Sequence, residues 1–240
     1  MFDPDKIKGI IFDYGGTVDS NGVHWAEVIR TAYESLHIHV GLEAFREAYK
    51  HGERVLAKNR VVLPGHNFWH VLRLKVEAQL QWLAENSHLP ACDNLSRCVS
   101  EIADWCYASA QISINAARPV LKKLSERYPL LLVTNFYGNI ESVLKDFYLR
   151  EFFTTVIESA VVGVRKPDPA IFRLAVDQSG FTAAELAVVG DSYDKDIIPA
   201  TAAGCQTIWL KKAGWNPCTG NETAGLIITD FAQLKGIFSL

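Results

Sequence analysis

Two kinds of apolar pattern alternate along most of this chain. Short runs rich in apolar and β-branched residues have the length of buried strands, and stretches with apolar residues at helical spacing separate them. Because such alternation is typical of a parallel sheet covered by helices on both faces, we expect an α/β protein with a Rossmann-like, doubly wound parallel sheet. The predicted strands are Lys8–Phe12, Leu130–Thr134, Thr154–Glu158, Leu186–Gly190, Thr207–Leu210 and Gly225–Thr229.

Two of the intervening helices have recognisable ends. Asp168 and Pro169 suit the N-cap and first turn of a helix, and Gly180 suits its C-terminal stop. A second helix is expected from about Asp194 to Ala203, where Gly204 follows. These helices belong to the crossover connections between parallel strands.

One long segment after the first predicted strand lacks any convincing strand pattern. We expect an all-helical domain at residues 21–110, inserted into a core domain that comprises residues 1–20 and 111–240. Pro64-Gly65 and Leu89-Pro90 mark loops within the insertion. The predicted helices are Trp25–Leu36, Leu42–Leu56, Phe68–Leu83 and Leu95–Tyr107.

Composition and charge exclude several classes of function. The 240 residues are 49% hydrophobic and 21% charged, with a net charge of −3 and no Lys/Arg block, so we expect no nucleic-acid partner. No apolar run approaches the roughly 20 residues that a membrane span needs. The acidic start at residues 1–6 does not resemble a signal peptide, and the five cysteines form no CxxC pair. We expect a cytoplasmic protein with reduced thiols; no pattern predicts its oligomeric state.

Polar residues with chemical potential stand at or just after the ends of predicted strands. Asp13 follows the first strand, Thr134 and Asn135 end the second, and Asp191 follows the fourth. Lys166 lies in the loop before the helix that Asp168 caps. Because the carboxyl ends of parallel strands share one edge of the sheet, we expect these groups to meet in one crevice.

The chemistry of this set suits phosphoryl transfer. An aspartate such as Asp13 can become phosphorylated as a covalent intermediate. A threonine hydroxyl, an amide and backbone N–H groups can hold phosphate oxygens, while Lys166 supplies positive charge. Asp13 and Asp191 would repel each other in one crevice unless a cation lay between them, and carboxylate oxygens are ligands that suit Mg²⁺.

Three sequence stretches carry a family resemblance. Asp13-Tyr14-Gly15-Gly16-Thr17 resembles the Asp-x-Asp-Gly-Thr signature of the haloacid dehalogenase (HAD) superfamily. The stretches Val162–Pro169 and Val188–Ser192 resemble its later motifs, in the same order and after the expected elements. The chain is identified on these motifs as a HAD superfamily member, and the insertion at 21–110 resembles the helical cap of its members with type-1 caps.

The resemblance implies a role for each matched position. Asp13 would be the nucleophile and a Mg²⁺ ligand, together with the backbone carbonyl of Gly15 and the carboxylate of Asp191. Asp196, or Asp194, would orient metal-bound water or Lys166. The groups implied to bind the phosphate of a small phosphorylated substrate are Thr134, Asn135, Lys166 and the backbone at Gly16.

One position departs from the superfamily signature. Gly15 stands where most phosphatases of the superfamily carry the aspartate that acts as general acid and base, a contribution of about 10²–10⁴-fold in rate. We therefore expect a phosphohydrolase with atypical acid/base chemistry and weak activity on poor leaving groups. Asp19 is the nearest other acid in sequence, although the family pattern suggests that it braces the entry to the cap.

Three other interpretations stay open at this stage. Phosphonoacetaldehyde hydrolases carry a small residue at this position and cleave a C–P bond of a phosphonate through a cap lysine, for which Lys50, Lys58 and Lys75 are available. The 2-haloacid dehalogenases need no metal, but they resemble Asp-x-Tyr-Gly-Thr, which Gly15 does not match. A phosphate-binding protein without turnover is the third. The cap residues considered for selectivity are Trp25, Arg54, Lys58, Arg60, His66, Trp69 and His70.

Overall fold

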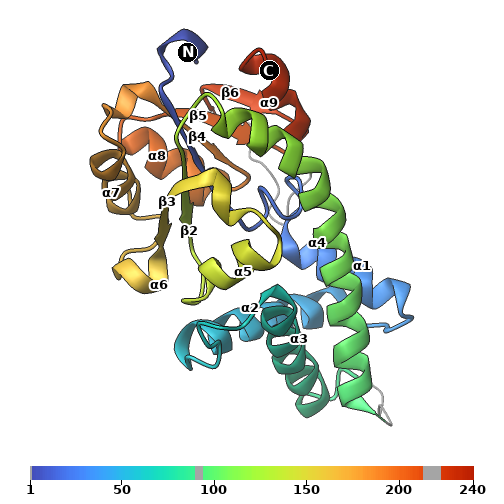
Figure 1. Cartoon of the computed structure of the whole chain (residues 1–240). Helices are drawn as coiled ribbons and strands as arrows, with labels where there is room; N and C mark the ends of the chain where they lie inside the picture. Colours follow the sequence, from blue (N-terminus) through green and yellow to red (C-terminus); the bar gives the residue numbers. More distant parts are fainter. Residues whose placement is uncertain (1, 90–93, 213–222) are drawn as a thin grey trace.

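The computed structural model describes residues 2–89, 94–212 and 223–240 and contains one parallel sheet. Its strand order is β3-β2-β1-β4-β5-β6, with β1 between β2 and β4 (Figure 1). Phe12 of β1 is in register with Leu132 of β2 and Val189 of β4. The predicted sheet is confirmed, with Asp13 following a central strand. The strands are β1 (Gly9–Phe12), β2 (Leu130–Thr134), β3 (Phe153–Glu158), β4 (Leu186–Gly190), β5 (Gln206–Leu210) and β6 (Leu226–Ile228).

Both faces of the sheet are buried, because successive residues of a strand point to opposite faces. Ile10 and Phe12 of β1 join one apolar core, and Ile11 joins another. The first core contains the helices α5 (Ile140–Asp146) and α9 (Leu234–Ile237), and the second contains α7 (Ala170–Ser179) and α8 (Ile198–Ala202). The predicted doubly wound arrangement is therefore confirmed. The short helix α6 (Ser159–Val162) follows β3.

The helix predicted to begin at Asp168 shows how local sequence sets its ends. The Asp168 side chain accepts a hydrogen bond from the Ala170 N–H (2.9 Å), which satisfies a donor at the start of α7. Gly180 ends the helix in a left-handed conformation with φ of 75°. The stretch predicted as one helix from Asp194 divides into a π-helical turn, Tyr193–Ile197, followed by α8.

The insertion is helical throughout its described part and lies below the sheet in Figure 1. Asn67 and Asn94 cap the third and fourth helices by accepting hydrogen bonds from backbone N–H groups three residues later. None of the described helices has the length and apolar character that crossing a membrane requires. The helices are α1 (Trp25–Ser35), α2 (Leu42–Lys58), α3 (Phe68–Glu85) and α4 (Leu95–Ser125).

The fourth helix is longer than the sequence pattern predicts. We expected it to end at Tyr107, whereas α4 continues to Ser125 and passes through position 110, the predicted domain boundary. The reason is that buried apolar residues continue at helical spacing, and the last of these pack on the sheet. The N-terminal half of α4 thus packs in the insertion and its C-terminal half in the core. These buried residues are Ala110, Ile114, Ala117, Val120, Leu121 and Leu124.

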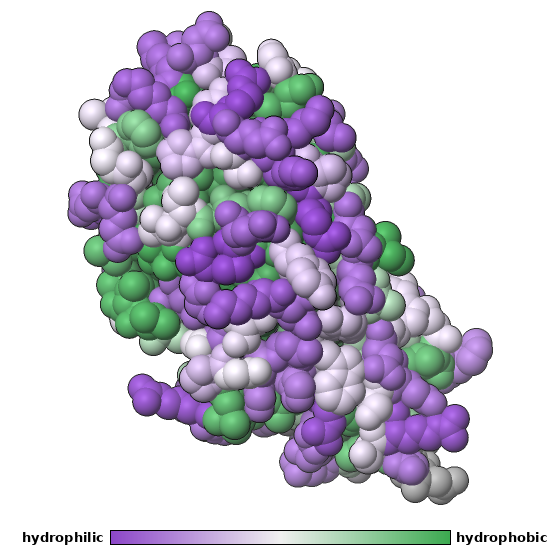
Figure 2. Space-filling model, viewed as in Figure 1, coloured by the Kyte–Doolittle hydropathy of each residue, from purple (hydrophilic) through white to green (hydrophobic). Residues whose placement is uncertain are grey.

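The visible surface in Figure 2 is mainly hydrophilic, with apolar side chains in small patches. Large exposed apolar residues are spread over several elements, among them Leu42 on α2, Ile112 on α4 and Val161 on α6. Scattered exposed residues of this kind are normal for a folded domain. The buried charged residues that bear on function lie inside the molecule, at the carboxyl edge of the sheet.

Candidate active site

The residues predicted to meet at the carboxyl edge of the sheet line one cavity of about 150 Å³. Asp13 follows β1, Thr134 ends β2 and Asp191 follows β4, and these three strands are neighbours. Lys166 reaches the same point from the loop before α7. The structure thus brings the predicted groups together, as parallel strand order requires.

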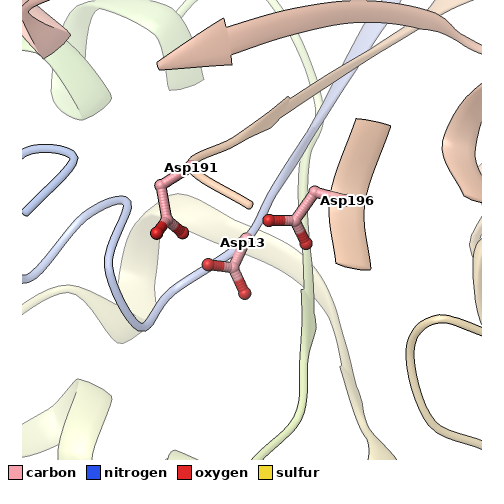
Figure 3. A group of neighbouring side chains, drawn as sticks. All are labelled: Asp13, Asp191 and Asp196. Carbon is pink, nitrogen blue, oxygen red and sulfur yellow. The ribbon is translucent and has the colours of Figure 1, made fainter. Parts of the chain in front are cut away.

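Three carboxylates form an acidic cluster in this cavity (Figure 3). Oxygen atoms of Asp13, Asp191 and Asp196 all lie within 4.8 Å of one another. Asp13 and Asp196 are almost fully buried, with 5% and 1% of their surface exposed. Asp194, the other candidate from the sequence, is exposed and does not join the cluster.

Burial of Asp196 depends on the π-helical turn after β4. Asp196 Oδ2 accepts a hydrogen bond from the Ser192 N–H (3.0 Å), which folds the turn back on itself. A Cβ atom at Gly190 would overlap with the Asp196 side chain, so glycine is required at the end of β4. A π-turn places this carboxylate inward and leaves Asp194 outward.

Lys166 joins two of the three acids. Its Nζ atom lies 2.5 Å from Asp13 Oδ1 and 2.6 Å from Asp196 Oδ1. The side chain of Asn135 holds the Lys166 backbone through two hydrogen bonds of 2.9 Å, one accepted from the N–H and one donated to the carbonyl. The Asn135 amide therefore positions Lys166, and both of its polar ends are engaged in doing so.

Thr17 is a site residue for which the sequence analysis assigned no role. Its hydroxyl donates to Asp13 Oδ2 (2.9 Å) and accepts from the Asp191 N–H (3.1 Å). The hydroxyl thereby ties the loop after β1 to the loop after β4. The sequence feature that could have revealed this role is the position of Thr17, four residues after Asp13 in the Asp-x-x-x-Thr segment.

The two glycines of the first motif differ in their surroundings. Gly16 has φ of 96°, and its N–H donates to Asp19 Oδ1 (2.7 Å), so that N–H is already engaged. A Cβ atom at Gly15 would have no atom within 4 Å, because this position faces open space. Gly15 lines the cavity, and no acid side chain is present there.

Burial and repulsion between carboxylates raise the pKa values of Asp13 and Asp191. Burial raises the pKa of Asp13 to about 6, against the opposing attraction of Lys166. Burial, followed by repulsion from Asp13 and Asp196, raises the pKa of Asp191 well above its usual range. Burial alone would lower the pKa of Lys166, but attraction by the two neighbouring carboxylates raises it.

This electrostatic arrangement fits a divalent cation. One lysine faces three carboxylates, so the cluster carries excess negative charge that a cation would neutralise. The donor set consists of hard carboxylate oxygens, which suit Mg²⁺, and Gly15 lines the same cavity. Asp13, Asp191 and Asp196 are therefore the residues that fit such an ion.

Two further titratable residues from the loop before α1 line the cavity. Burial raises the pKa of Asp19 to about 7, although hydrogen bonds from Gly16 N–H and Trp25 Nε1 (2.9 Å) oppose this. Burial lowers the pKa of His24 to about 4. His24 Nδ1 accepts from the Ala26 N–H (3.1 Å), so Nε2 carries the proton of the neutral ring.

The insertion supplies one side of the cavity. Of the cap residues considered for selectivity, Trp25 lines it and the other six do not. The residues that the sequence analysis missed follow helical spacing on α2 and α3, but this spacing also suits a core. They are Tyr49, Glu53, Phe68, Val71 and Leu72, with Phe136 and Tyr137 from the core.

Lys75, one of the three lysines considered for C–P cleavage, lies in the cavity wall and is paired. Its Nζ atom is 2.5 Å from Glu53 Oε1, and Tyr137 donates to Glu53 Oε2 (3.0 Å). Burial would lower the pKa of Lys75, but Glu53 holds it well above its usual range, so the amine stays protonated. Lys50 and Lys58 are exposed and do not line the cavity.

Comparison with known proteins agrees with this geometry. The sequence model of the haloacid dehalogenase-like hydrolase family matches residues 7–204 of this chain. The chain belongs to this family. This HAD-like hydrolase therefore carries the family's core, with a helical insertion after the first strand and an acidic cluster at the sheet edge.

Several relatives of this HAD-like hydrolase are phosphatases. A glyceraldehyde 3-phosphate phosphatase of Pyrococcus furiosus is 28% identical over 235 residues, covering 95% of this chain and 92% of the relative. A phosphoserine phosphatase of Thermus thermophilus is 39% identical over 106 residues, a match that spans 44% of this chain and only 42% of the relative.

Solved structures share the fold at low sequence identity. A HAD hydrolase, YfnB of Bacillus subtilis, bound to magnesium, has a TM-score of 0.60 at 17% identity, covering 98% of this chain and 99% of the other. A dehalogenase in an intermediate complex has a TM-score of 0.65 at 18% identity, with both chains fully covered. The fold is therefore shared with solved structures named as a hydrolase and as a dehalogenase.

Proposed function

We propose that this HAD-like hydrolase is a Mg²⁺-dependent phosphohydrolase of a small phosphorylated metabolite, with Asp13 as the nucleophile. The observation that carries the proposal is the contact of Asp13 with Lys166 and Thr17 inside an acidic cluster of the kind that binds Mg²⁺. The phosphatase names of the two relatives support the reaction class. The magnesium bound to YfnB supports the choice of metal.

Each residue has a chemical task in this proposal. An oxygen of Asp13 attacks phosphorus, the bond from phosphorus to the leaving oxygen breaks, and water then hydrolyses the aspartyl phosphate. Lys166 and the Thr134 hydroxyl hold phosphoryl oxygens, and Asn135 keeps Lys166 in place. Asp13, Asp191 and the Gly15 carbonyl would hold Mg²⁺, with Asp196 in support, and the ion would supply further positive charge against the phosphoryl oxygens.

The acid/base chemistry is atypical in this proposal because Gly15 offers no carboxyl group. The leaving oxygen then departs without a proton from the usual position, which slows esters of basic alcohols. A C–P hydrolase acting on a phosphonate also has a small residue at this position, but it needs an uncharged cap lysine. Lys75 is charged and paired with Glu53, which argues against that alternative.

Phosphate release from acetyl phosphate tests the proposal. We expect release with Mg²⁺, none after chelation with EDTA, and none from Asp13→Asn, because the covalent step belongs to Asp13 alone. Asp194→Asn is a matched control, since Asp194 is exposed and outside the cluster. Release that survives in Asp13→Asn would contradict the assigned nucleophile. Binding of phosphate and Mg²⁺ without turnover of any phosphate compound would favour a binding protein instead.

A further inference from the structure

Open space lies beside the nucleophile. A Cβ atom at Gly15 would meet no atom within 4 Å, and Gly15 lines the same cavity as Asp13. A side chain at position 15 would take up part of this space. In this chain the space is free for the organic part of a substrate whose phosphoryl group is at Asp13.

Aromatic rings from both domains form a continuous wall of the cavity, here called the ring wall: Trp25, Phe68, Phe136 and Tyr137. The ring centroids of Trp25 and Phe68 are 5.1 Å apart, those of Phe68 and Phe136 6.5 Å, and those of Phe136 and Tyr137 5.3 Å. Trp25 is also held by its hydrogen bond to Asp19. These contacts fix the ring wall before a substrate binds, which lowers the entropy lost on binding.

Two of the three lysines that line the cavity already have carboxylate partners. Lys75 is paired with Glu53, and Lys166 with Asp13 and Asp196. Lys195 also lines the cavity, but it is exposed to solvent. This end of the cavity therefore suits an uncharged organic group better than one that carries a carboxylate or a second phosphate.

The leaving group must satisfy the same site chemically. Without an acid at Gly15 it departs as an anion, and a phenolate, whose conjugate acid has a pKa near about 10, departs more readily than an alkoxide. The cavity volume of about 150 Å³ is below the roughly 300–1,000 Å³ of sites for drug-sized ligands, so one ring is the expected size.

We propose that the ring wall is a leaving-group subsite for an aromatic ring, and that the substrate is a small aryl phosphate. This inference rests on the proposed phosphohydrolase function and names its substrate class. Asp13 attacks phosphorus, the P–O(aryl) bond breaks, and its electron pair leaves on the phenolate, which takes a proton from water. Water then cleaves the aspartyl phosphate and restores Asp13.

Four phosphates separate ring binding from leaving-group chemistry. Phenyl phosphate has a ring and a good leaving group, benzyl phosphate a ring only, acetyl phosphate a good leaving group only, and ethyl phosphate neither. We expect a higher kcat/KM for phenyl phosphate than for benzyl phosphate, because phenolate is the better leaving group, and a lower KM for phenyl phosphate than for acetyl phosphate, because only the former carries a ring. Because chemistry on benzyl and ethyl phosphate is slow, KM reports binding for both, and we expect benzyl phosphate to have a KM at least about tenfold lower.

Substitution of the ring wall supplies the second test. Phe136→Leu should raise KM for phenyl and benzyl phosphate several-fold and leave KM for acetyl and ethyl phosphate within about twofold. Phe147→Leu is the matched control, because Phe147 packs on Phe68 with ring centroids 5.8 Å apart but does not line the cavity. The control should leave the preference for ring-bearing substrates unchanged.

The outcomes distinguish this inference from the function on which it rests. Equal KM values for benzyl and ethyl phosphate, or a ring preference that survives Phe136→Leu, would each overturn the subsite and leave the phosphohydrolase standing. No release from any of the four phosphates, or release unchanged in Asp13→Asn, would overturn the proposed function itself and the subsite with it.

Discussion

The backbone of Gly16 passes so close to Asp191 that a Cβ atom at position 16 would overlap with the Asp191 carboxylate. The two residues follow neighbouring strands, and Thr17 links the same two loops. The position of Asp191, a predicted metal ligand, therefore depends on the absence of a side chain at Gly16 in the loop after β1.

Gly16→Ala should remove turnover and lower stability, because it displaces Asp191 and strains a residue with φ of 96°. Gly138→Ala is a close control: Gly138 has φ of 97°, but a Cβ atom there would meet nothing within 4 Å. Both variants should lose about 1–2 kcal/mol of unfolding free energy from backbone strain, measured by urea denaturation. Retained turnover in Gly138→Ala, with loss in Gly16→Ala, is the expected contrast; equal turnover in both would refute it.

Mg²⁺ affinity should depend on Asp191 and not on Asp194. Asp191→Asn removes a charge from the acidic cluster and should weaken Mg²⁺ binding by at least about 10–100-fold in calorimetric titrations. Asp194→Asn removes the same charge from an exposed position three residues away and should leave the affinity within about twofold. If the two variants bind Mg²⁺ equally well, the metal site is elsewhere.

An acid installed at position 15 should restore the missing proton transfer. The open space around the Gly15 Cβ position accommodates a side chain, so Gly15→Asp should fold as the native chain does. We expect it to raise the rate on ethyl phosphate by up to about 10²–10⁴-fold, with a smaller gain if the new carboxyl group is poorly oriented. Gly15→Asn has the same shape without the acid and should show no gain.

The same reasoning predicts that the rate of the native protein falls steeply as the pKa of the leaving group's conjugate acid rises. A flat dependence would mean that another group already donates the proton, and Asp19→Asn and then His24→Ala would identify it.

His24 should make the folded state less stable as the pH falls. Its pKa is about 4 in the folded protein against 6.5 for a free histidine, so below pH 6.5 the unfolded chain takes up a proton that the folded chain does not. Stability is lost as pH falls from about 7 towards 4, by up to about 3 kcal/mol. His24→Asn keeps a residue suited to the helix N-cap and should lose less stability than the native chain between pH 7 and 4.5 in urea unfolding with EDTA. An identical loss in both proteins would contradict the assignment.

Much of the core architecture was predictable from the sequence, because the strands are apolar runs and reactive polar residues follow their ends. Asp13 and Asp191 each follow an apolar run, and the rule that parallel strands share a carboxyl edge places them together. The choice between Asp194 and Asp196 was not predictable, since it depends on a π-turn that two nearby acids do not reveal.

The parts that escaped prediction depend on partners distant in sequence. Asn135 has the residue type of a phosphate ligand, yet its amide holds the backbone of Lys166. Glu53 and Lys75 come from separate helices, and each alone has the pattern of a solvated helix residue. The extent of α4 was missed because its apolar stripe changes partner, from insertion to sheet, without a break in spacing.

The continuity of α4 gives the insertion two unlike connections to the core. The chain enters the insertion through the loop before α1 and returns within a single helix of 31 residues, about 46 Å long. Just beyond the far end of that helix, Arg127 donates to the carbonyl groups of Phe238 and Ser239, on the side of the molecule where α9 lies (Figure 1). The C-terminal half of α4 thus anchors the insertion in the core. Because the insertion carries Trp25 and Phe68 of the ring wall, their distance from Asp13 depends on how this end of α4 packs at the opposite end of the molecule.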